Sequence, residues 1–295
     1  MNEPANKESP MFPTARPPKR HTYLDGLDGV SDEQLISDWI GLVVPSDFVK
    51  VVRAIRTVAI AGKQEPAVVM NDILGMTPAN EDDRYFNTPA ELFPFASTHC
   101  DGDHYGFLVL APEVASPDFP IAHLCPMDSD GVVLVGGSVR VAISLILART
   151  LNWSRKRADF EQLRSSVLAV ANHLGWEPVD NEPPAISIPI GWRLVPTSDG
   201  VGVLAPVEAF SKAPLRPWEF GLIDEFVAAA KVAIASRHFG SALYFLRQAY
   251  WFAPSGWQGI GKLMCEAYVG LGRVLLAQVW DRSLKKLEER MPPFM

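Results

Sequence analysis

The residues best suited to chemistry gather in one stretch near the middle of the chain. They are a group of imidazole, thiol and carboxyl side chains: His99, Cys100, Asp101, Asp103, His104, His123 and Cys125. Imidazole and thiolate are the ligands that zinc prefers, so the candidate metal ligands are Cys100, His104, His123 and Cys125. Their spacing matches no standard zinc module, in which paired ligands lie two to four residues apart. We therefore expect a polar turn without a metal or other cofactor.

The same stretch offers a second kind of chemistry. Cys100 with His104 or His123 would make a thiolate and base pair, while Asp101 and Asp103 would serve as an acid and base or as calcium ligands. No recognisable oxyanion hole or family signature accompanies the thiol. The turn also lacks the alternating oxygens and distal glutamate of a calcium loop. We expect no catalytic residues, with a zinc- or thiol-dependent enzyme as an alternative.

The elements around these residues indicate an antiparallel sheet. Strands are predicted over 92–98, 105–110, 121–126 and 132–135, joined by glycine-containing acidic turns at 100–103 and 128–131. Ser138 has the position of an N-cap for an apolar helix over 139–151. Helices precede this meander, beginning near Ser31 and again after Pro45. The fold class is therefore α+β, an antiparallel β-meander with flanking helices, followed by a helical C-terminal part.

Proline and charge divide the rest of the chain. We expect a disordered tail over 1–25, an α+β domain over 26–180, a linker with a β-hairpin over 181–217, and helices over 218–295. A helix is predicted over 158–174, and strands over 186–195 and 201–207 flank the turn of the hairpin. The last region reads as three or four helices.

Composition restricts the partners. The net charge of −7 and the pI of about 5.4 argue against nucleic-acid binding. No apolar run is long enough to cross a membrane, and three cysteines without a signal sequence indicate reduced thiols in the cytoplasm. The acidic charge is concentrated, because the range 71–130 holds eleven acidic residues and one basic residue, Arg84. That range carries −10 and the remainder +3, so we expect an acidic surface that attracts a basic partner.

The meander resembles the SUKH superfamily, which includes bacterial immunity proteins and related fungal cell-wall regulators. The resemblance extends over about 30–151 and is specific for 92–151. Its elements are a strand with Phe95-Ala96, a Gly102-Asp103 turn, Tyr105, Pro120-Ile121, an acidic turn over 128–131 and a helix capped by Ser138. The resemblance implies a binding protein without catalysis, often one that neutralises a toxin by direct contact.

The C-terminal helices resemble tetratricopeptide repeats. One candidate repeat has Phe239, Ala242, Leu246, Ala249 and Pro254, and the next has Tyr268, Gly272 and Ala277. Small residues allow two helices to approach closely, and a proline ends the hairpin. Since so few repeats cannot form a free-standing solenoid, we expect a helical hairpin packed on the preceding domain, with a peptide-binding module as the alternative.

These observations predict a protein-binding module whose acidic meander docks a basic protein, such as the catalytic domain of a toxin. The residues expected to face the partner are Phe95, Asp101, Asp103, Tyr105, Asp128 and Asp130. The alternative binding function is a scaffold that uses the C-terminal helices.

Overall fold

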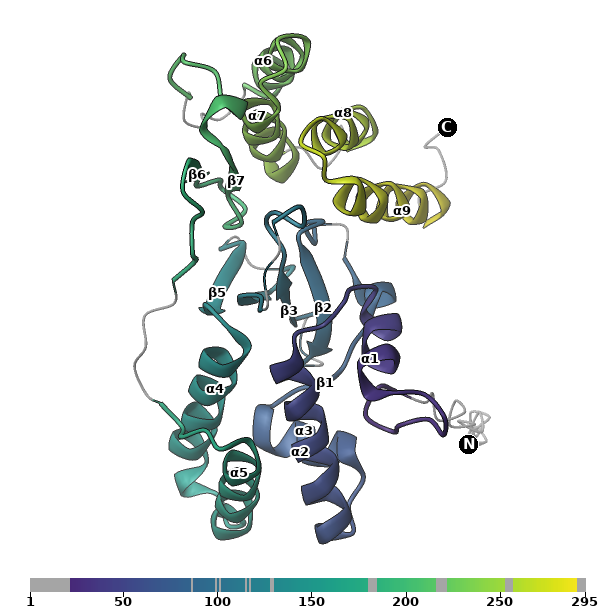
Figure 1. Ribbon diagram of the computed structural model, residues 1–295, viewed down its shortest axis with the longest axis vertical. Coiled ribbons are helices and arrows are strands. Elements are labelled where there is room, and N and C mark those ends of the chain that lie inside the picture. The colour runs from purple at the N-terminus through teal and green to yellow at the C-terminus, as the bar shows by residue number, and fades with distance from the viewer. Residues whose placement is uncertain are drawn as a thin grey trace, which may run out of the picture.

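The structure is a computed structural model that describes residues 22–85, 87–98, 100, 102–114, 116, 118–127, 130–179, 185–215, 222–252 and 257–290. The predicted fold class is confirmed, because an antiparallel sheet with flanking helices is followed by a helical C-terminal part. Figure 1 shows an elongated molecule. One group of helices lies at one end, the sheet lies in the middle, and a second group of helices lies at the other end.

The sheet is a five-stranded meander in which strands adjacent in sequence pair with each other. The four predicted strands are confirmed, and a short strand is added at one edge. The strands are β1 (Thr77–Pro78), β2 (Leu92–Ser97), β3 (His104–Leu108), β4 (Ile121–Leu124) and β5 (Val132–Gly136). Because every connection is antiparallel, the β2–β3 and β4–β5 turns lie at the same end of the sheet.

Helices of the N-terminal half cover one face of this sheet. Ser31 and Ser138 act as N-caps, since their hydroxyls accept hydrogen bonds from the backbone N–H groups of Gln34 and Val141. Phe48 packs between the rings of Phe95 and Phe107, with ring centroids 4.8 and 5.0 Å away. The elements are α1 (Asp32–Ile40), α2 (Ser46–Gly62), α3 (Pro66–Leu74), η1 (Glu81–Asp83), α4 (Val139–Trp153), η2 (Ser154–Lys156) and α5 (Phe160–Leu174).

The opposite face of the sheet is covered by a β-hairpin, β6 (Trp192–Val195) and β7 (Val203–Pro206), which is followed by η3 (Val207–Ala209). Val201 and Leu204 from the hairpin region are buried in one cluster with Leu92, Leu108 and Leu124 of the sheet. The segment predicted as a linker over 181–217 therefore contributes to the hydrophobic core. The sheet is therefore a middle layer, with the N-terminal helices packed on one face and the hairpin on the other.

Two turns with the same sequence hold the hairpin against the sheet. The sequence Ser-Asp-Gly-Val occurs at 129–132, where Val132 begins β5, and at 198–201, shortly before β7. Ser129 lies outside the described residues. The backbone N–H of Val132 donates to the carbonyl of Asp199 at 2.7 Å. A Cβ atom on Gly200, whose φ is +79°, would lie 2.2 Å from the carbonyl oxygen of Val132. Glycine is required there because the two backbones touch.

The C-terminal part consists of two helical hairpins. Short connections join α6 (Ile223–Ala235) to α7 (Phe239–Phe252) and α8 (Trp257–Gly270) to α9 (Val274–Arg290). A Cβ on Gly270 of α8 would meet the ring of Phe239, and one on Gly261 would meet Leu284. Gly261 and Gly270, which the sequence pattern did not single out, therefore allow close helix contact, whereas a Cβ on Gly272 of the predicted repeat would meet nothing within 4 Å. Figure 1 shows that these helices lie on the same side of the sheet as the hairpin of β6 and β7.

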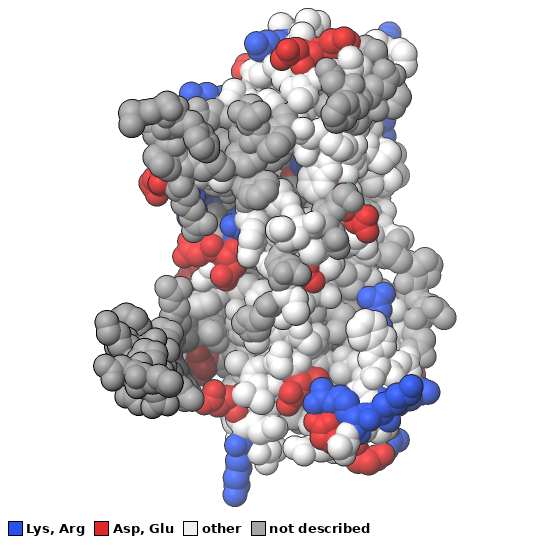
Figure 2. Space-filling model, turned by 180° about the vertical axis from the view of Figure 1, so that it is seen from behind, with Lys and Arg blue, Asp and Glu red and all other residues white. Residues whose placement is uncertain are grey.

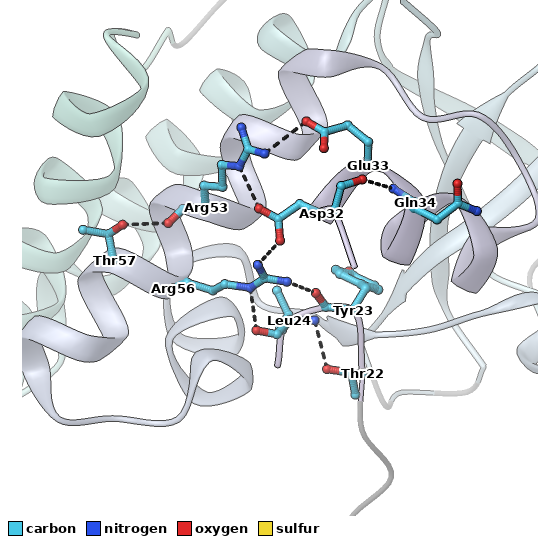
Figure 3. Close-up of polar contacts among 10 residues, drawn as sticks. Thr22, Tyr23, Leu24, Asp32, Glu33, Gln34, Arg53, Arg56 and Thr57 are labelled. Atoms are coloured by element: carbon cyan, nitrogen blue, oxygen red, sulfur yellow. Dashed lines mark hydrogen bonds and ion pairs between the residues drawn. The ribbon is translucent and has the colours of Figure 1, made fainter. Parts of the chain in front are cut away.

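The chain before α1 is fixed to the N-terminal helices. Arg56 of α2 donates to the backbone carbonyls of Tyr23 and Leu24, and Asp32 lies between the guanidinium groups of Arg53 and Arg56 (Figure 3). Tyr23 and Leu24 are buried, and the Tyr23 hydroxyl donates to the carbonyl of Phe95 at 2.9 Å. The predicted tail boundary at residue 25 is therefore wrong, because Tyr23 and Leu24 belong to the core. Residues 1–21 lie outside the described residues.

Charged side chains form small separate groups on the surface shown in Figure 2. Basic side chains gather at the end of the molecule where α2–α5 lie, with acidic side chains beside them. One pair of this kind joins Arg157 and Asp159 at 2.6 Å. Among the helices described, none has the length and apolar character needed to cross a membrane.

Candidate functional site

The candidate site lies at the end of the sheet where the β2–β3 and β4–β5 turns meet. Cys100 and Asp130 are exposed, and Asp103 is partly exposed. His104 at the start of β3 pairs with Leu124 at the end of β4, which in turn pairs with Val132 at the start of β5. Strands in a sheet are about 4.8 Å apart, so the two turns are separated by only about 10 Å. Asp101 and Asp128 lie outside the described residues.

Asp103 is held by the strand beside it. Its Oδ2 atom lies 3.1 Å from Nε2 of His123 on β4, and the ring of His123 packs 4.7 Å from that of Tyr105. Tyr105 is partly buried, and this burial, followed by the nearby charge of Asp103, raises the pKa of its hydroxyl. The pair therefore fixes one carboxylate at the sheet end while leaving part of it accessible.

Phe95 has a structural role, and the prediction that its side chain faces a partner is wrong. The side chain is completely buried. It packs on Phe48 and Phe107 in the core, on the helix-covered side of β2. Alternation along a strand shows which side chains share a face of the sheet but not which face is covered. The packing of the helices decided that the face with Phe95 is buried.

The four candidate metal ligands are not brought together. His123 faces the same side of the sheet as its partner Tyr105, whereas His104 and its partner Leu124 face the other side. Among the described residues, no group of three or more His, Cys, Asp or Glu side chains could hold a metal ion. His99 and Asp101 are outside that search.

His104 is occupied by two neighbours. Its Nδ1 atom lies 2.8 Å from the carbonyl oxygen of Gly102, and its Nε2 atom lies 3.1 Å from Oγ1 of Thr88. The carbonyl can only accept, so Nδ1 carries the proton and Nε2 accepts from the hydroxyl. Burial lowers the pKa of the imidazole from 6.5 to about 4. The side chain is therefore a neutral structural residue at neutral pH.

A loop that sequence reasoning did not connect with the site completes the sheet end. Tyr85 stacks on His104 with ring centroids 6.2 Å apart, and it occupies the space beside Gly102 where a Cβ would lie. The Asn87 side chain donates to the carbonyl of Pro126 at 2.9 Å. Tyr85 and Met127 are 43% and 76% exposed. The sequence signal that could have indicated this contact was Gly102, because a glycine in a turn leaves space for an aromatic ring.

We call this surface the acidic edge. It combines three carboxylates with two exposed or partly exposed apolar side chains, and its residues are Asp83, Tyr85, Asp103, Met127 and Asp130. Arg84, the basic residue of the range 71–130, directs its guanidinium to the backbone carbonyls of Pro89 and Leu92. Its charge is therefore turned into the loop and away from solvent.

Other carboxylates of the acidic range are used inside the molecule. Glu91 accepts from Arg247 of α7 at 2.7 Å, Glu113 accepts from Arg273 at 2.9 Å, and Asp82 pairs with Lys286 of α9 at 2.6 Å. Part of the negative charge that was predicted to attract a basic partner is thus neutralised by basic residues of the C-terminal part of the chain. Asp118 also has a contact inside the molecule, because its carboxylate accepts from the N–H of Val139 at the start of α4.

Arg247 is the centre of a buried polar cluster that joins the sheet, the hairpin and the C-terminal helices. It also donates to Asp199 of the hairpin turn at 2.5 Å, while the Tyr268 hydroxyl of α8 donates to Glu91 at 2.8 Å. Burial alone would lower the pKa of Arg247, but the carboxylates of Asp199 and Glu91 outweigh this effect and raise it. The cluster is therefore a charged, structural junction between the sheet and the helices.

The thiols differ in their surroundings. Cys100 is exposed in the β2–β3 turn, and Cys125 is partly exposed at the end of β4. Cys265 on α8 lies 3.6 Å from the carbonyl of Ala277, and burial raises the pKa of its thiol to about 11. All three cysteines are described, and no disulfide joins them. Cys265 is thus a poor nucleophile, as expected for a partly buried thiol packed against the core.

No protein-family model matches this chain, and a search of curated proteins found no similar sequence.

Proposed function

We propose that this chain is a non-enzymatic protein-binding module that docks a basic protein at the acidic edge. The observation that carries the proposal is the meeting of the β2–β3 turn, the β4–β5 turn and the Tyr85 loop at one end of the sheet. The loop with Asp83 and Tyr85, the turn with Asp103 and the turn with Met127 and Asp130 support the proposal because they supply carboxylates and accessible apolar side chains to one end of the sheet. We propose a cytoplasmic location, which suits three cysteines without a disulfide.

The composition of the acidic edge suits a partner with a basic surface and an apolar centre. Uncompensated carboxylates raise the association rate of a cationic protein, and this effect weakens with salt. Buried anchors at the centre of an interface set its residence time, and aromatic side chains and methionine are enriched there. Tyr85 and Met127 supply such anchors. Among the described residues, neither Asp83 nor Asp130 is paired with a Lys or Arg side chain.

We further propose that the partner is the catalytic domain of a toxin. The support is the resemblance of residues 92–151 to SUKH immunity proteins together with the acidic edge. An immunity protein acts by occupying a toxin surface, so it needs an accessible binding surface and no reactive group. The scaffold alternative has less support, because Arg247, Tyr268 and Arg273 of the C-terminal helices contact the rest of the chain.

The test uses charge reversal in the full chain. Immobilised wild type captures proteins from a lysate of the source organism, and captured basic proteins are identified and produced recombinantly. Association and dissociation rates are then measured for wild type, the double variant Asp83→Lys/Asp130→Lys and the control Glu177→Lys/Glu208→Lys. Both variants change the net charge equally, and all four residues are exposed.

We expect the acidic-edge variant to associate with the partner at least about tenfold more slowly at low salt, with a smaller change in dissociation rate. The control variant should keep most of the wild-type rate. Equal association rates for the two variants would contradict docking at the acidic edge. Inhibition of the partner's catalytic activity by wild type would support the toxin assignment, and an unaffected activity would contradict it.

A further inference from the structure

A pocket of about 330 Å³ lies away from the acidic edge, between the β3–β4 connection and the segment before β6. Its volume is at the lower end of the range for small-molecule sites, about 300–1,000 Å³. The wall is mainly apolar, with a few polar groups, as in most such sites. The apolar residues that form the main wall are Leu108, Leu110, Val114, Phe119, Ile186 and Leu204.

Asp118 is the charged residue of this lining. The backbone N–H of Phe119 donates to its Oδ1 atom at 2.8 Å, and the N–H of Val139 lies 3.3 Å from both carboxylate oxygens. A carboxylate has about four acceptor positions, so two donors leave capacity for another. Burial raises the pKa of this carboxyl, and the charge of Asp47 on α2 adds to that effect. A cation in the pocket could therefore donate to the Asp118 carboxylate, whose acceptor positions are not all used by the protein.

The segment before β6 forms one side of the pocket. Ile186, Ser187 and Pro189 of this segment line it. Their neighbours in sequence, Ile188 and Ile190, are 48% and fully exposed and do not line the pocket.

We propose that this pocket binds a small, mainly apolar molecule that carries a primary ammonium group. The apolar body lies on Leu108, Phe119 and Leu204, and the ammonium group donates to the carboxylate of Asp118. The pocket is distinct from the acidic edge, so this site is independent of the proposed protein partner.

Three probes with similar apolar bodies test the ligand class on the full chain. They are 2-phenylethylamine, 2-phenylethanol and 3-phenylpropionate, and binding is followed by methyl NMR of the leucine side chains. The amine should shift the resonances of Leu108, Leu110 and Leu204 and bind about tenfold or more tightly than the alcohol, because hydrogen bonds to charged groups are the stronger ones. The anion should bind most weakly.

Two variants locate the interaction. Asp118→Asn keeps an oxygen that can accept from Val139 while removing the charge, so it should abolish the preference for the amine over the alcohol. The control Glu177→Gln removes one exposed carboxylate that belongs neither to the pocket nor to the acidic edge, and it should bind all three probes as wild type does.

Several outcomes would overturn the proposal. They are equal binding of amine and alcohol to wild type, shifts confined to other leucines, or no shift at about 10 mM amine, which lies beyond the range of weak specific binding. Unchanged amine preference in Asp118→Asn would also overturn it. The comparison of probes on wild type decides the matter even if that variant does not fold.

Discussion

Arg247 of α7 donates a 2.7 Å hydrogen bond to Glu91, which directly precedes β2, and both side chains are buried although 156 residues separate them. The same guanidinium contacts Asp199 of the β6–β7 turn. One side chain therefore links the meander, the hairpin and the helical part. The chain should consequently unfold as one cooperative unit, and its two halves should not be stable when separated.

Arg247→Met should lower the free energy of unfolding by about 3–5 kcal/mol, because it leaves the carboxylates of Glu91 and Asp199 buried without a cation. Urea unfolding at neutral pH measures the change. The control Arg155→Met removes an exposed cation and should shift the free energy by no more than about 0.5 kcal/mol. A loss of less than about 1 kcal/mol in Arg247→Met would contradict the importance of the cluster.

Glu91→Gln in the Arg247→Met background should recover part of the lost stability, because it removes one of the two unpaired charges. The gain is measured as the coupling free energy in a double-mutant cycle. Strictly additive effects of the two substitutions would show that the side chains do not interact. If Arg247→Met does not fold, Arg247→Lys keeps the positive charge and gives a smaller loss to measure.

The backbone contact between the two Ser-Asp-Gly-Val turns can be tested with a matched pair of glycines. Gly200→Ala should cost more than about 2 kcal/mol, because a Cβ would meet the Val132 carbonyl and φ is positive. Gly175→Ala has a similar φ of +67° but nothing within 4 Å of the added Cβ, so its cost should be only about 1 kcal/mol. Thermal or urea unfolding compares them. Equal losses would show that the turns are not in contact.

His104 should make stability depend on pH. Its pKa in the folded protein is about 4, below the ordinary 6.5, so between these values the unfolded chain binds more protons. The contribution of the neutral imidazole is therefore complete above pH 6.5 and falls as the pH decreases towards 4. At pH 4.5 the loss should be about 2–3 kcal/mol.

The measurement for His104 is the free energy of unfolding in urea at several pH values, for wild type and for His104→Gln. Carboxylates titrate in both proteins, so only the difference in slope reports on the histidine. The variant should show a weaker decrease between pH 6.5 and 4.5. Identical slopes would mean that the imidazole titrates normally and is not buried in the folded protein.

The cysteines should react in a fixed order. Cys100 is exposed, whereas the thiol of Cys265 has a pKa of about 11 and is partly buried. In the native protein at pH 8, a disulfide reagent such as dithionitrobenzoate should modify Cys100 first and Cys265 last, because the thiolate is the reactive form. Cys100→Ser should remove the fastest phase of the reaction. A fast phase that disappears in Cys265→Ser instead would contradict the assignment.

Much of the local structure could be predicted from short-range sequence patterns. The helix start near Ser31, the Ser138 cap, the alternating strands of the meander and the glycine turns depend on a few neighbouring residues, and the structure confirms them. The boundary of the N-terminal tail was wrong because the burial of Tyr23 depends on its bond to Phe95, which is distant in sequence. The hairpin over 186–207 was assigned to a linker because its burial also depends on residues distant in sequence, among them Leu92 and Leu108 of the sheet.

The candidate site was only partly predictable. The two acidic turns were identified, and their meeting at one end of the sheet followed from the antiparallel order. The burial of Phe95 and the separation of His104 from His123 were not predicted, because alternation gives two faces without saying what covers each. The contribution of Tyr85 depended on a loop that has no regular pattern.

The sequence by itself determined the elements, their order and the concentration of negative charge between residues 71 and 130. Only the tertiary structure decided where that charge is directed. Glu91, Glu113 and Asp82 turn to the basic residues of the C-terminal helices, whereas Asp83 and Asp130 remain exposed. The physical reason is that propensity and periodicity act over a few residues, while the partner of a charge depends on which distant segments pack together.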